Sequence, residues 1–425
     1  MSPLTDLALT IVVEAKRIAD FLDENNLPQP SFGIEGPPRL PLPIHDLEIR
    51  TSQGRLYESL QKLSALTLGP VEHLRWQAMD QFNDNMSLQA ILRFGIADAV
   101  PSAPSSTTTF AAVATICGIP EALVARLVRH AAIYHVFREP VPHHVAHTCA
   151  SLALRNGEPE RDWHDMIFEE WAPAAVRSVD AMQQYPGSAQ EPEETAFGMA
   201  FGGKSIYRYL DERPERARVF GSAMKSLGQG TMHRVQHLLE GYNWGALGAA
   251  TVVDIGGSHG HASIAIARQA PELKFVVQDL PSTAEYGRKI LDPALADRIS
   301  FLAHDMNDVQ PVVGADIYLF RHVFPNWSKK YCVKFLKNLV PAMTQGAKVL
   351  LSEGCLVEPG VLPYWEEKYL RGLDLCMTCL FSGNERTEEE WREIFALADE
   401  RFKFLGCKHL AEATVSFLFE AIWDP

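Results

Sequence analysis

The sequence predicts a doubly wound α/β domain in its C-terminal part, preceded by a mainly helical N-terminal part. The first observation is an apolar, β-branched run that ends in a glycine-rich turn, Thr251–Gly260 (TVVDIGGSHG). A helix-like segment, His261–Ala270, follows, and a second apolar run, Lys274–Val277, leads to Asp279, 25 positions after Asp254. Strand, tight turn, helix, strand and acid, in this order, make the first half of a nucleotide-binding sheet.

The glycines of the turn indicate a close approach to a ligand, because a Cβ would block the approach or the required φ. Their spacing, G-G-x-x-G, comes from Gly256, Gly257 and Gly260 and differs from the G-x-G-x-x-G of a pyrophosphate loop. A glycine loop alone leaves the cofactor open. Three acids at successive predicted strand ends narrow the choice, because they would repel a diphosphate; they are Asp254, Asp279 and Asp305. Adenosine with a cationic tail suits them better, so we expect S-adenosylmethionine (SAM), with its ribose held by Asp279.

Bulk properties exclude several classes of protein. A chain of 425 residues predicts two or three domains, and a net charge of −14 argues against a nucleic-acid partner, which needs a basic face. No stretch reaches the ~20 apolar residues of a membrane span, and the N-terminus lacks the pattern of a secretory signal. Seven scattered cysteines favour a reducing, cytoplasmic location. The C-x-x-C pair Cys376 and Cys379 is interpreted as helix packing, so no metal is expected.

The N-terminal part is predicted to be helical. Apolar residues recur at helical spacing over residues 1–25, a Pro-rich connector follows over Leu27–Pro43, and a second helix is predicted over Asp46–Leu66. The apolar stripe of the first helix needs a partner, which is either a second subunit or its own chain.

Residues from Glu72 to Glu139 predict several short helices followed by a strand. Thr107–Thr109 can cap a helix over Phe110–Ile116, and a helix over Glu121–His135 then leads to a strand over Val136–Glu139. This order resembles a winged helix. Because the chain is acidic, we expect a dimerisation or scaffold role for it rather than DNA binding. The predicted division is N-terminal helices and connector over 1–71, the winged-helix region over 72–151, a helical bridge over 152–244 and the SAM-binding α/β domain over 245–425.

Six segments resemble, in order and spacing, the plant and fungal small-molecule O-methyltransferases. They are Val253–Gly260, Gln278–Pro281, His304–Met306, Asp316–Trp327, Leu373–Met377 and Asn384–Thr387. The resemblance implies SAM binding and a homodimer built through the winged-helix region. It also implies a set of cofactor contacts: Asp254, Gly256, Gly257, Asp279, Leu280, Asp305, Met306 and Arg321. Within this set, the two glycines pack on the amino-acid part, Asp279 holds the ribose, Asp305 and Met306 flank the adenine, and Arg321 replaces a lysine near the cofactor carboxylate.

One position departs from the family pattern. Methylating members carry a histidine before the Asp-Trp or Asn-Trp pair, and this histidine removes the substrate proton; here the position is Pro325, followed by Asn326. The two glutamates that orient that histidine are retained as Glu353 and Glu385. Loss of a general base typically costs ~10²–10⁴-fold in rate, which a phenol of low pKa survives better than an alcohol. His322 either substitutes for the base or packs beneath the site, and Asn326 offers only hydrogen bonds.

Two enzymatic functions follow, and the lost base favours the first of them. The chain resembles the fungal methyltransferase-fold pericyclases of 2-pyridone alkaloid biosynthesis, of the leporin-pathway type, in which the base is also replaced. Such an enzyme dehydrates a 2-pyridone alcohol and directs a pericyclic closure, of hetero-Diels–Alder or Alder-ene type, without methyl transfer; it is a lyase or isomerase. The SAM sulfonium then acts as a fixed charge opposite a carbonyl oxygen. The alternative is SAM-dependent O-methylation of a phenolic or polyketide hydroxyl.

Further candidate residues follow from this comparison. His147 and Thr148 fall where fungal relatives place a His-Thr pair at the pocket wall, and His147 either contacts the substrate or caps the following helix. Glu353 and Glu385 either act as acid or base in dehydration or are inherited and satisfied by hydrogen bonds. Apolar candidates for the substrate wall are Phe324, Met377, Phe381 and Phe201. A non-catalytic scaffold is a third possibility, which the complete cofactor set argues against.

Overall fold

The computed structural model describes residues 2–43, 46–186, 190–411 and 414–425. They form two compact units. The first comprises Met1–Ala172 and Arg213–Leu227, and the second comprises Pro173–Glu212 and Gly228–Pro425. Each is described by itself below. The four-part division made from the sequence stays a prediction.

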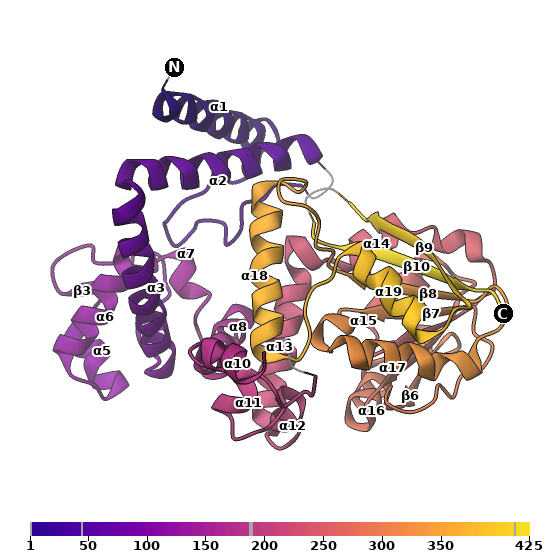
Figure 1. Ribbon diagram of the computed structural model, residues 1–425. Helices are drawn as coiled ribbons and strands as arrows, with labels where there is room; N and C mark the ends of the chain where they lie inside the picture. Colours follow the sequence, from indigo (N-terminus) through magenta and orange to yellow (C-terminus); the bar gives the residue numbers. More distant parts are fainter. Residues whose placement is uncertain (1, 44–45, 187–189, 412–413) are drawn as a thin grey trace. The chain divides into compact units, whose positions relative to one another are not determined.

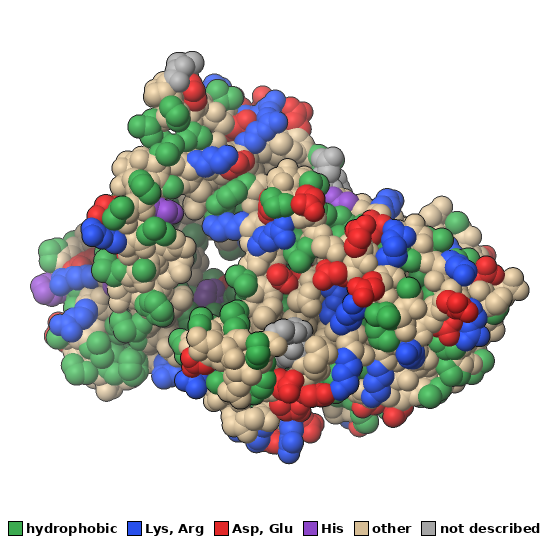
Figure 2. Space-filling view, in the orientation of Figure 1, with side chains coloured by type: hydrophobic (Ala, Val, Ile, Leu, Met, Phe, Trp, Pro, Cys, Tyr) green, Lys and Arg blue, Asp and Glu red, His purple; other side chains and the backbone are tan. Residues whose placement is uncertain are grey.

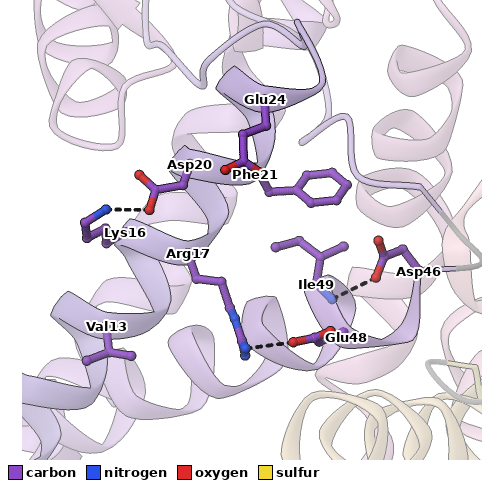
Figure 3. Close-up of a pocket in the computed structure, with 9 residues that line it drawn as sticks. All are labelled: Val13, Lys16, Arg17, Asp20, Phe21, Glu24, Asp46, Glu48 and Ile49. Atoms are coloured by element: carbon purple, nitrogen blue, oxygen red, sulfur yellow. Dashed lines mark hydrogen bonds and ion pairs between the residues drawn. The ribbon is translucent and has the colours of Figure 1, made fainter.

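The first unit begins with three long helices (Figure 1). Helices α1 (Pro3–Glu24) and α2 (Leu47–Leu68) were both predicted, and the Ser2 and Asp46 side chains cap their first turns. The apolar stripe of α1 packs against α2 and buries Ile18 and Leu22, so this helix docks at least in part on its own chain. A hollow of 490 Å³ lies between the two helices, lined by both polar and apolar side chains, and Arg17 reaches Glu48 there at 2.7 Å (Figure 3).

Helix α3 (Pro70–Arg93) corrects one prediction. The sequence was interpreted as several short helices from Glu72 onward, whereas residues 70–93 form a single helix of 24 residues. Gly69, with φ of 76°, and Pro70 set its start, and no further glycine or proline interrupts it before Gly95.

The expected winged-helix order follows α3 and the short α4 (Ile96–Ala99). Helices α5 (Phe110–Cys117) and α6 (Glu121–Ile133) meet at 112°, a helix-turn-helix angle. Thr109 caps α5, as predicted, and left-handed Gly118 ends it. A small antiparallel sheet in the order β1-β3-β2 completes the region; its strands are β1 (Thr108–Thr109), β2 (Phe137–Arg138) and β3 (His144–His147).

The predicted bridge consists of short helices. They are α7 (Cys149–Leu152), α8 (Pro159–Met166), the π-helix η1 (Ile167–Trp171), α9 (Ala172–Ala175), α10 (Ser178–Gln184), α11 (Ala196–Ala200), α12 (Ile206–Asp211), α13 (Pro214–Gln229), η2 (Thr231–His233), α14 (Val235–Gly241) and η3 (Trp244–Leu247). Among the described residues, no single helix is long and apolar enough to cross a membrane, and only the bent pair α5 and α6 passes by length and composition.

A seven-stranded sheet in the order β6-β5-β4-β7-β8-β10-β9 organises the second unit (Figure 1). The strands are β4 (Thr251–Ile255), β5 (Lys274–Asp279), β6 (Ile299–Ala303), β7 (Ile317–Arg321), β8 (Lys348–Glu353), β9 (Phe402–His409) and β10 (Phe417–Trp423). The first five are parallel, and β10 pairs antiparallel with both β8 and β9. The doubly wound α/β prediction is therefore confirmed.

Helices cover both faces of this sheet, because β-strand side chains alternate between the faces. The covering helices include α15 (His261–Gln269), α16 (Pro281–Ile290), α17 (Lys329–Leu339) and α19 (Glu388–Ala398), whereas α18 (Tyr364–Leu380) packs against α11. The short turns are η4 (Pro293–Leu295), η5 (Phe324–Asn326) and η6 (Val340–Ala342). In β4, Val253 packs into the core beneath α17 and α19, whereas Val252 packs beneath α14, α15 and α16. Both valines are fully buried.

The site is defined by the carboxyl ends of the parallel strands. The chain runs from β4 outward through β5 to β6 and then returns to β7 on the other side of β4. Such a reversal leaves a crevice at the strand ends, where doubly wound folds bind ligands. The last residues of the five parallel strands are Ile255, Asp279, Ala303, Arg321 and Glu353.

Candidate functional site

The glycine turn after β4 folds tightly over the strand end. Gly256 has φ of 70°, and a Cβ there would lie 2.8 Å from Val323 Cγ2. A Cβ at Gly257 would lie 2.6 Å from the carboxyl carbon of Asp254. Asp254 itself is buried and accepts a hydrogen bond from Ser263 Oγ at 2.6 Å, and burial raises the pKa of its carboxyl to about 6. The structure thus places Asp254 beneath the turn, where it supports the glycines.

Asp279 stands at the end of β5 with both carboxylate oxygens fixed. One oxygen accepts from the Ser258 backbone N–H at 2.8 Å, and the other accepts from the Leu280 N–H at 2.8 Å. Each oxygen keeps a further lone pair, because a carboxylate oxygen can accept two hydrogen bonds. Leu280 is 50% exposed beside it. At the end of β5, Asp279 therefore offers two oxygen acceptors, and Leu280 offers an apolar surface beside them.

The other predicted cofactor residues lie at the same edge. Asp305 follows β6 and is exposed, and its Oδ1 accepts from the Asn307 N–H at 2.9 Å, which fixes the turn that carries the half-buried Met306. Arg321 ends β7 and donates to the carbonyl of His233 at 2.5 Å. Its other terminal nitrogen lies 3.1 Å from His261 Nε2.

These residues fit SAM. Asp279 offers acceptors for a ribose diol, Leu280 and Met306 offer apolar surface for a purine, and Arg321 supplies a cation at the end of β7 for a carboxylate. A glycine turn in which a Cβ would collide brings the backbone to the same edge. The part of the chain that the structure describes holds no group of three or more His, Cys, Asp or Glu side chains suited to a metal ion.

Pro325 lies in the turn η5, directly after β7, and is buried. Arg386 clamps this turn, donating to the carbonyl of Phe324 at 3.1 Å and to that of Trp327 at 2.5 Å. Gly383 packs below it, since a Cβ there would lie 2.0 Å from the Pro325 carbonyl oxygen. The contacts with Arg386 and Gly383 therefore fix the backbone of this turn, although position 325 carries no basic side chain.

Glu353 and Glu385 lie side by side under this turn. Glu353 Oε1 accepts from the Val323 and Phe324 N–H groups at 3.0 and 3.3 Å. Glu385 Oε2 rests on the residue after Glu353, because a Cβ at Gly354 would lie 2.4 Å from it. Both carboxyls are buried, and Oε2 of each lacks a hydrogen-bond partner among the described residues.

Burial changes the ionisation of this carboxyl pair. It raises the pKa of Glu353 to about 7, although three backbone N–H groups oppose the shift. For Glu385, burial and the neighbouring Glu353 raise the pKa to about 8. At neutral pH Glu385 therefore keeps its proton, whereas Glu353 is partly ionised.

Asn326 and the predicted substrate wall have specific partners. Asn326 Nδ2 donates to the hydroxyl of Tyr207 on α12 at 2.8 Å, and the Tyr207 ring lies 5.8 Å from that of Phe381. Phe324 is fully buried, with its ring 5.4 Å from Trp391, so it belongs to the core. Three further apolar candidates are buried or half-buried in this unit: Met377, Phe381 and Phe201.

His147 and Thr148 belong to the first unit. His147 is buried, and its ring nitrogens lie 2.8 Å from Ser151 Oγ and 3.0 Å from the Val100 carbonyl. Thr148 caps α7 and donates to the Val136 carbonyl at 2.6 Å. Both ring nitrogens of His147 therefore have protein partners, which agrees with a structural role at the start of α7 and not with a substrate contact.

Sequence reasoning missed several polar residues of this edge, namely Tyr207, His233, His261, Tyr369 and Arg386. Tyr207 and His233 come from helical segments far from the strand motifs, and no spacing rule singles them out. Arg386 could have been predicted from the sequence, because it follows Glu385 in the Asn384–Thr387 segment.

Comparisons with known proteins agree with this geometry. The family model for the O-methyltransferase domain matches residues 183–399. The chlorophenol O-methyltransferase of Trichoderma longibrachiatum is 35% identical, over 98% of this chain and 90% of that protein.

Solved structures with the same fold include the following two. OxaC in complex with sinefungin and meleagrin has a TM-score of 0.79 at 22% identity and covers 99% of each chain. A pericyclic reaction enzyme has a TM-score of 0.73 at 21% identity, over 88% of this chain and 94% of that one. The chain belongs to the SAM-dependent O-methyltransferase family.

Proposed function

We propose that this protein transfers the methyl group of SAM to a phenolic hydroxyl of a small molecule of fungal secondary metabolism. The observation that carries the proposal is the retained carboxyl pair, Glu353 and Glu385, beside a complete cofactor edge. The relative that is 35% identical over almost the whole chain is named for methylation of a chlorophenol, which is an acidic hydroxyl. SAM supplies an electrophilic methyl group when bound.

Pro325 restricts the substrate class. Without an imidazole at this position, the enzyme forgoes a typical ~10²–10⁴-fold contribution to the rate. A phenol loses its proton far more readily than an aliphatic alcohol, so a phenol is the oxygen nucleophile that tolerates this loss. Tyr207 and Asn326, bonded to each other at the same turn, are positioned to orient the ring by hydrogen bonds and stacking.

A second candidate function rests on the same proline. Glu385, which keeps its proton at neutral pH, can serve as the acid that removes water from a 2-pyridone alcohol, and a fixed positive charge from the cofactor would stabilise the carbonyl oxygen during a pericyclic closure. Neither step needs a base at position 325. The names of the full-length relatives favour methyl transfer, which is why we place it first.

One experiment separates the two functions. The purified protein and SAM are incubated with chlorinated phenols and, separately, with a 2-pyridone alcohol, and product masses and released S-adenosylhomocysteine are measured. A gain of one methyl with an equal amount of S-adenosylhomocysteine supports methyl transfer. Loss of water or isomerisation without S-adenosylhomocysteine supports the second function. The Asp279→Ala variant, which lacks the ribose acceptors, is the matched control and should abolish either reaction.

The homodimer predicted from the family resemblance is part of this proposal. Apolar side chains are exposed on the three N-terminal helices (Figure 2), and on α3 they include Leu74, Met79 and Phe82, exposed by 64, 54 and 73%. A second copy of the chain would cover such a surface. Light scattering of the wild type and of a Leu74→Glu, Phe82→Glu variant tests it: a dimer that the variant converts to a monomer is expected, and a wild-type monomer would contradict it.

A further inference from the structure

Four buried polar atoms without hydrogen-bond partners gather at the ends of β7 and β8. They are His233 Nδ1, His322 Nε2, Glu353 Oε2 and Glu385 Oε2. A buried polar group left unpaired typically costs ~1–3 kcal/mol, and buried polar groups in native proteins are almost always paired. Several such atoms on neighbouring residues of a binding edge indicate a group that the substrate brings.

His322 has an unusual backbone and a fixed neighbour. Its φ is 56°, a left-handed conformation that a non-glycine residue rarely adopts and that is concentrated at functional sites. Its Nδ1 lies 3.8 Å from Glu353 Oε2, and the other oxygen of Glu353 is held by the Val323 and Phe324 N–H groups. When Glu353 is ionised, its carboxylate favours a proton on Nδ1, an assignment made from the neighbouring group, and this tautomer leaves a lone pair on Nε2.

His233 has the complementary arrangement. Its Nε2 lies 2.8 Å from the hydroxyl of Tyr369 on α18. Burial raises the pKa of Tyr369, so the phenol keeps its proton, and we assign it as the donor to Nε2, which is its hydrogen-bond partner among the described residues. The proton of the His233 ring therefore lies on Nδ1, which becomes a donor without a partner. The rings of His233 and His322 meet at 86° with centres 4.9 Å apart, so a free donor and a free acceptor share one corner of the site.

We infer that His322 replaces the missing base: its Nε2 accepts the proton of the substrate hydroxyl, while His233 Nδ1–H donates to the same oxygen. This inference rests on the proposed methyl transfer. In the step, the O–H bond breaks and its proton moves to Nε2. An oxygen lone pair forms the new bond to the methyl carbon, and the electrons of the carbon–sulfur bond leave with sulfur. The imidazolium then releases its proton to solvent.

The surrounding charges define what this base can do. Arg321, His233 and His261 face His322 together with Glu353, and burial, followed by the positive charge of Arg321 and the two neighbouring imidazoles, keeps the pKa of His322 well below 6.5. The imidazole is therefore neutral, and able to accept a proton, at pH 7. A base this weak suits a phenol and fails with an alcohol, in agreement with the substrate class argued from Pro325.

The experiment compares wild type with His322→Gln on phenols of graded acidity, at a pH where the most acidic is already ionised. We expect the variant to lose ~10²–10⁴-fold in kcat on the un-ionised phenols and little on the ionised one, because only the former need a base. SAM affinity, measured by calorimetry, should stay unchanged. His73→Gln, at a half-buried histidine of α3, is the matched control. An equal loss on all phenols, or no loss, overturns the inference.

A binding measurement makes the result independent of turnover. With S-adenosylhomocysteine present, the absorbance of bound 4-nitrophenol reports its ionisation, and we expect its apparent pKa to be lower on wild type than on His322→Gln. Equal values overturn the role of His322, whereas a failure to methylate any phenol overturns the proposed function alone. Introducing Pro325→His into His322→Gln should restore kcat, which shows that the variant is folded. If kcat does not recover in the double variant although it still binds SAM, the loss in His322→Gln is not a loss of proton transfer, and the inference is overturned.

Discussion

The Glu385→Gln variant should change how the stability of the protein depends on pH. Glu385 is buried, and burial with the neighbouring Glu353 raises its pKa from 4.5 to about 8. Below pH 4 both the folded and the unfolded chain hold the proton, so the group adds no penalty. As the pH rises past 4.5 the unfolded chain releases the proton, but the folded chain keeps it until about pH 8. Stability therefore falls across this window.

The size of the effect follows from the same numbers. Each unit of pKa difference corresponds to about 1.4 kcal/mol, so between pH 5 and pH 8 the wild type should lose on the order of 3 kcal/mol through this one group. Glutamine has nearly the same shape and no ionisation, so the variant should lose that much less over the same range. The pKa of Glu353 is also raised, so Glu353 contributes a further decrease of stability with pH in both the wild type and the variant.

Urea unfolding at pH 5, 6, 7 and 8 measures this difference. Glu400→Gln, at an exposed position, is the control and should follow the wild type. If wild type and Glu385→Gln lost stability in parallel as the pH rose, Glu385 would be ionised in the folded protein, and the account of an unpartnered carboxyl pair under the Pro325 turn would be wrong.

Three further predictions concern the cofactor edge and its support. Asp279→Asn should weaken SAM binding by about 10–100-fold in calorimetry, because charge-assisted bonds to the ribose are lost, and Asp305→Asn should weaken it less; equal effects would contradict the ribose assignment. Gly256→Ala should lower the free energy of unfolding by about 1–3 kcal/mol, since φ is 70° and the Cβ would lie 2.8 Å from Val323; an unchanged urea midpoint would refute this. Tyr207→Phe should cost about 1 kcal/mol in thermal unfolding, because Asn326 loses its acceptor; an unchanged melting temperature would contradict this role of the hydroxyl.

The fold was predictable where local rules and the tertiary structure agree. Thr251–Ile255 and Lys274–Asp279 form strands because buried parallel strands are apolar and β-branched, and the turn between β4 and α15 needs glycine for a positive φ. The single helix α3 was missed because its polar and apolar residues follow no clear amphipathic period, so only the absence of internal glycine and proline indicated its length.

The site was only partly predictable, for a physical reason. Asp279, Arg321 and Glu353 could be found because each ends a parallel strand, and strand ends meet at one edge. His233 and Tyr207 reach the same edge from helical segments, and their place depends on tertiary packing that no local pattern records. Likewise, the sequence shows that Pro325 lacks a base, but only the structure shows two carboxyl oxygens left without partners.

The division into two units has a consequence for any attempt to shorten the protein. The chain passes between the units three times, after Ala172, Glu212 and Leu227. Neither unit is therefore a continuous stretch that a single cut can release. A fragment that begins at the first strand of the large sheet would lack α12, and with it the Tyr207 hydroxyl that accepts from Asn326 beside Pro325. Such a deletion should therefore keep the cofactor motifs but remove Tyr207, so the sequence boundary of the α/β domain is not a boundary at which the second unit can be cut.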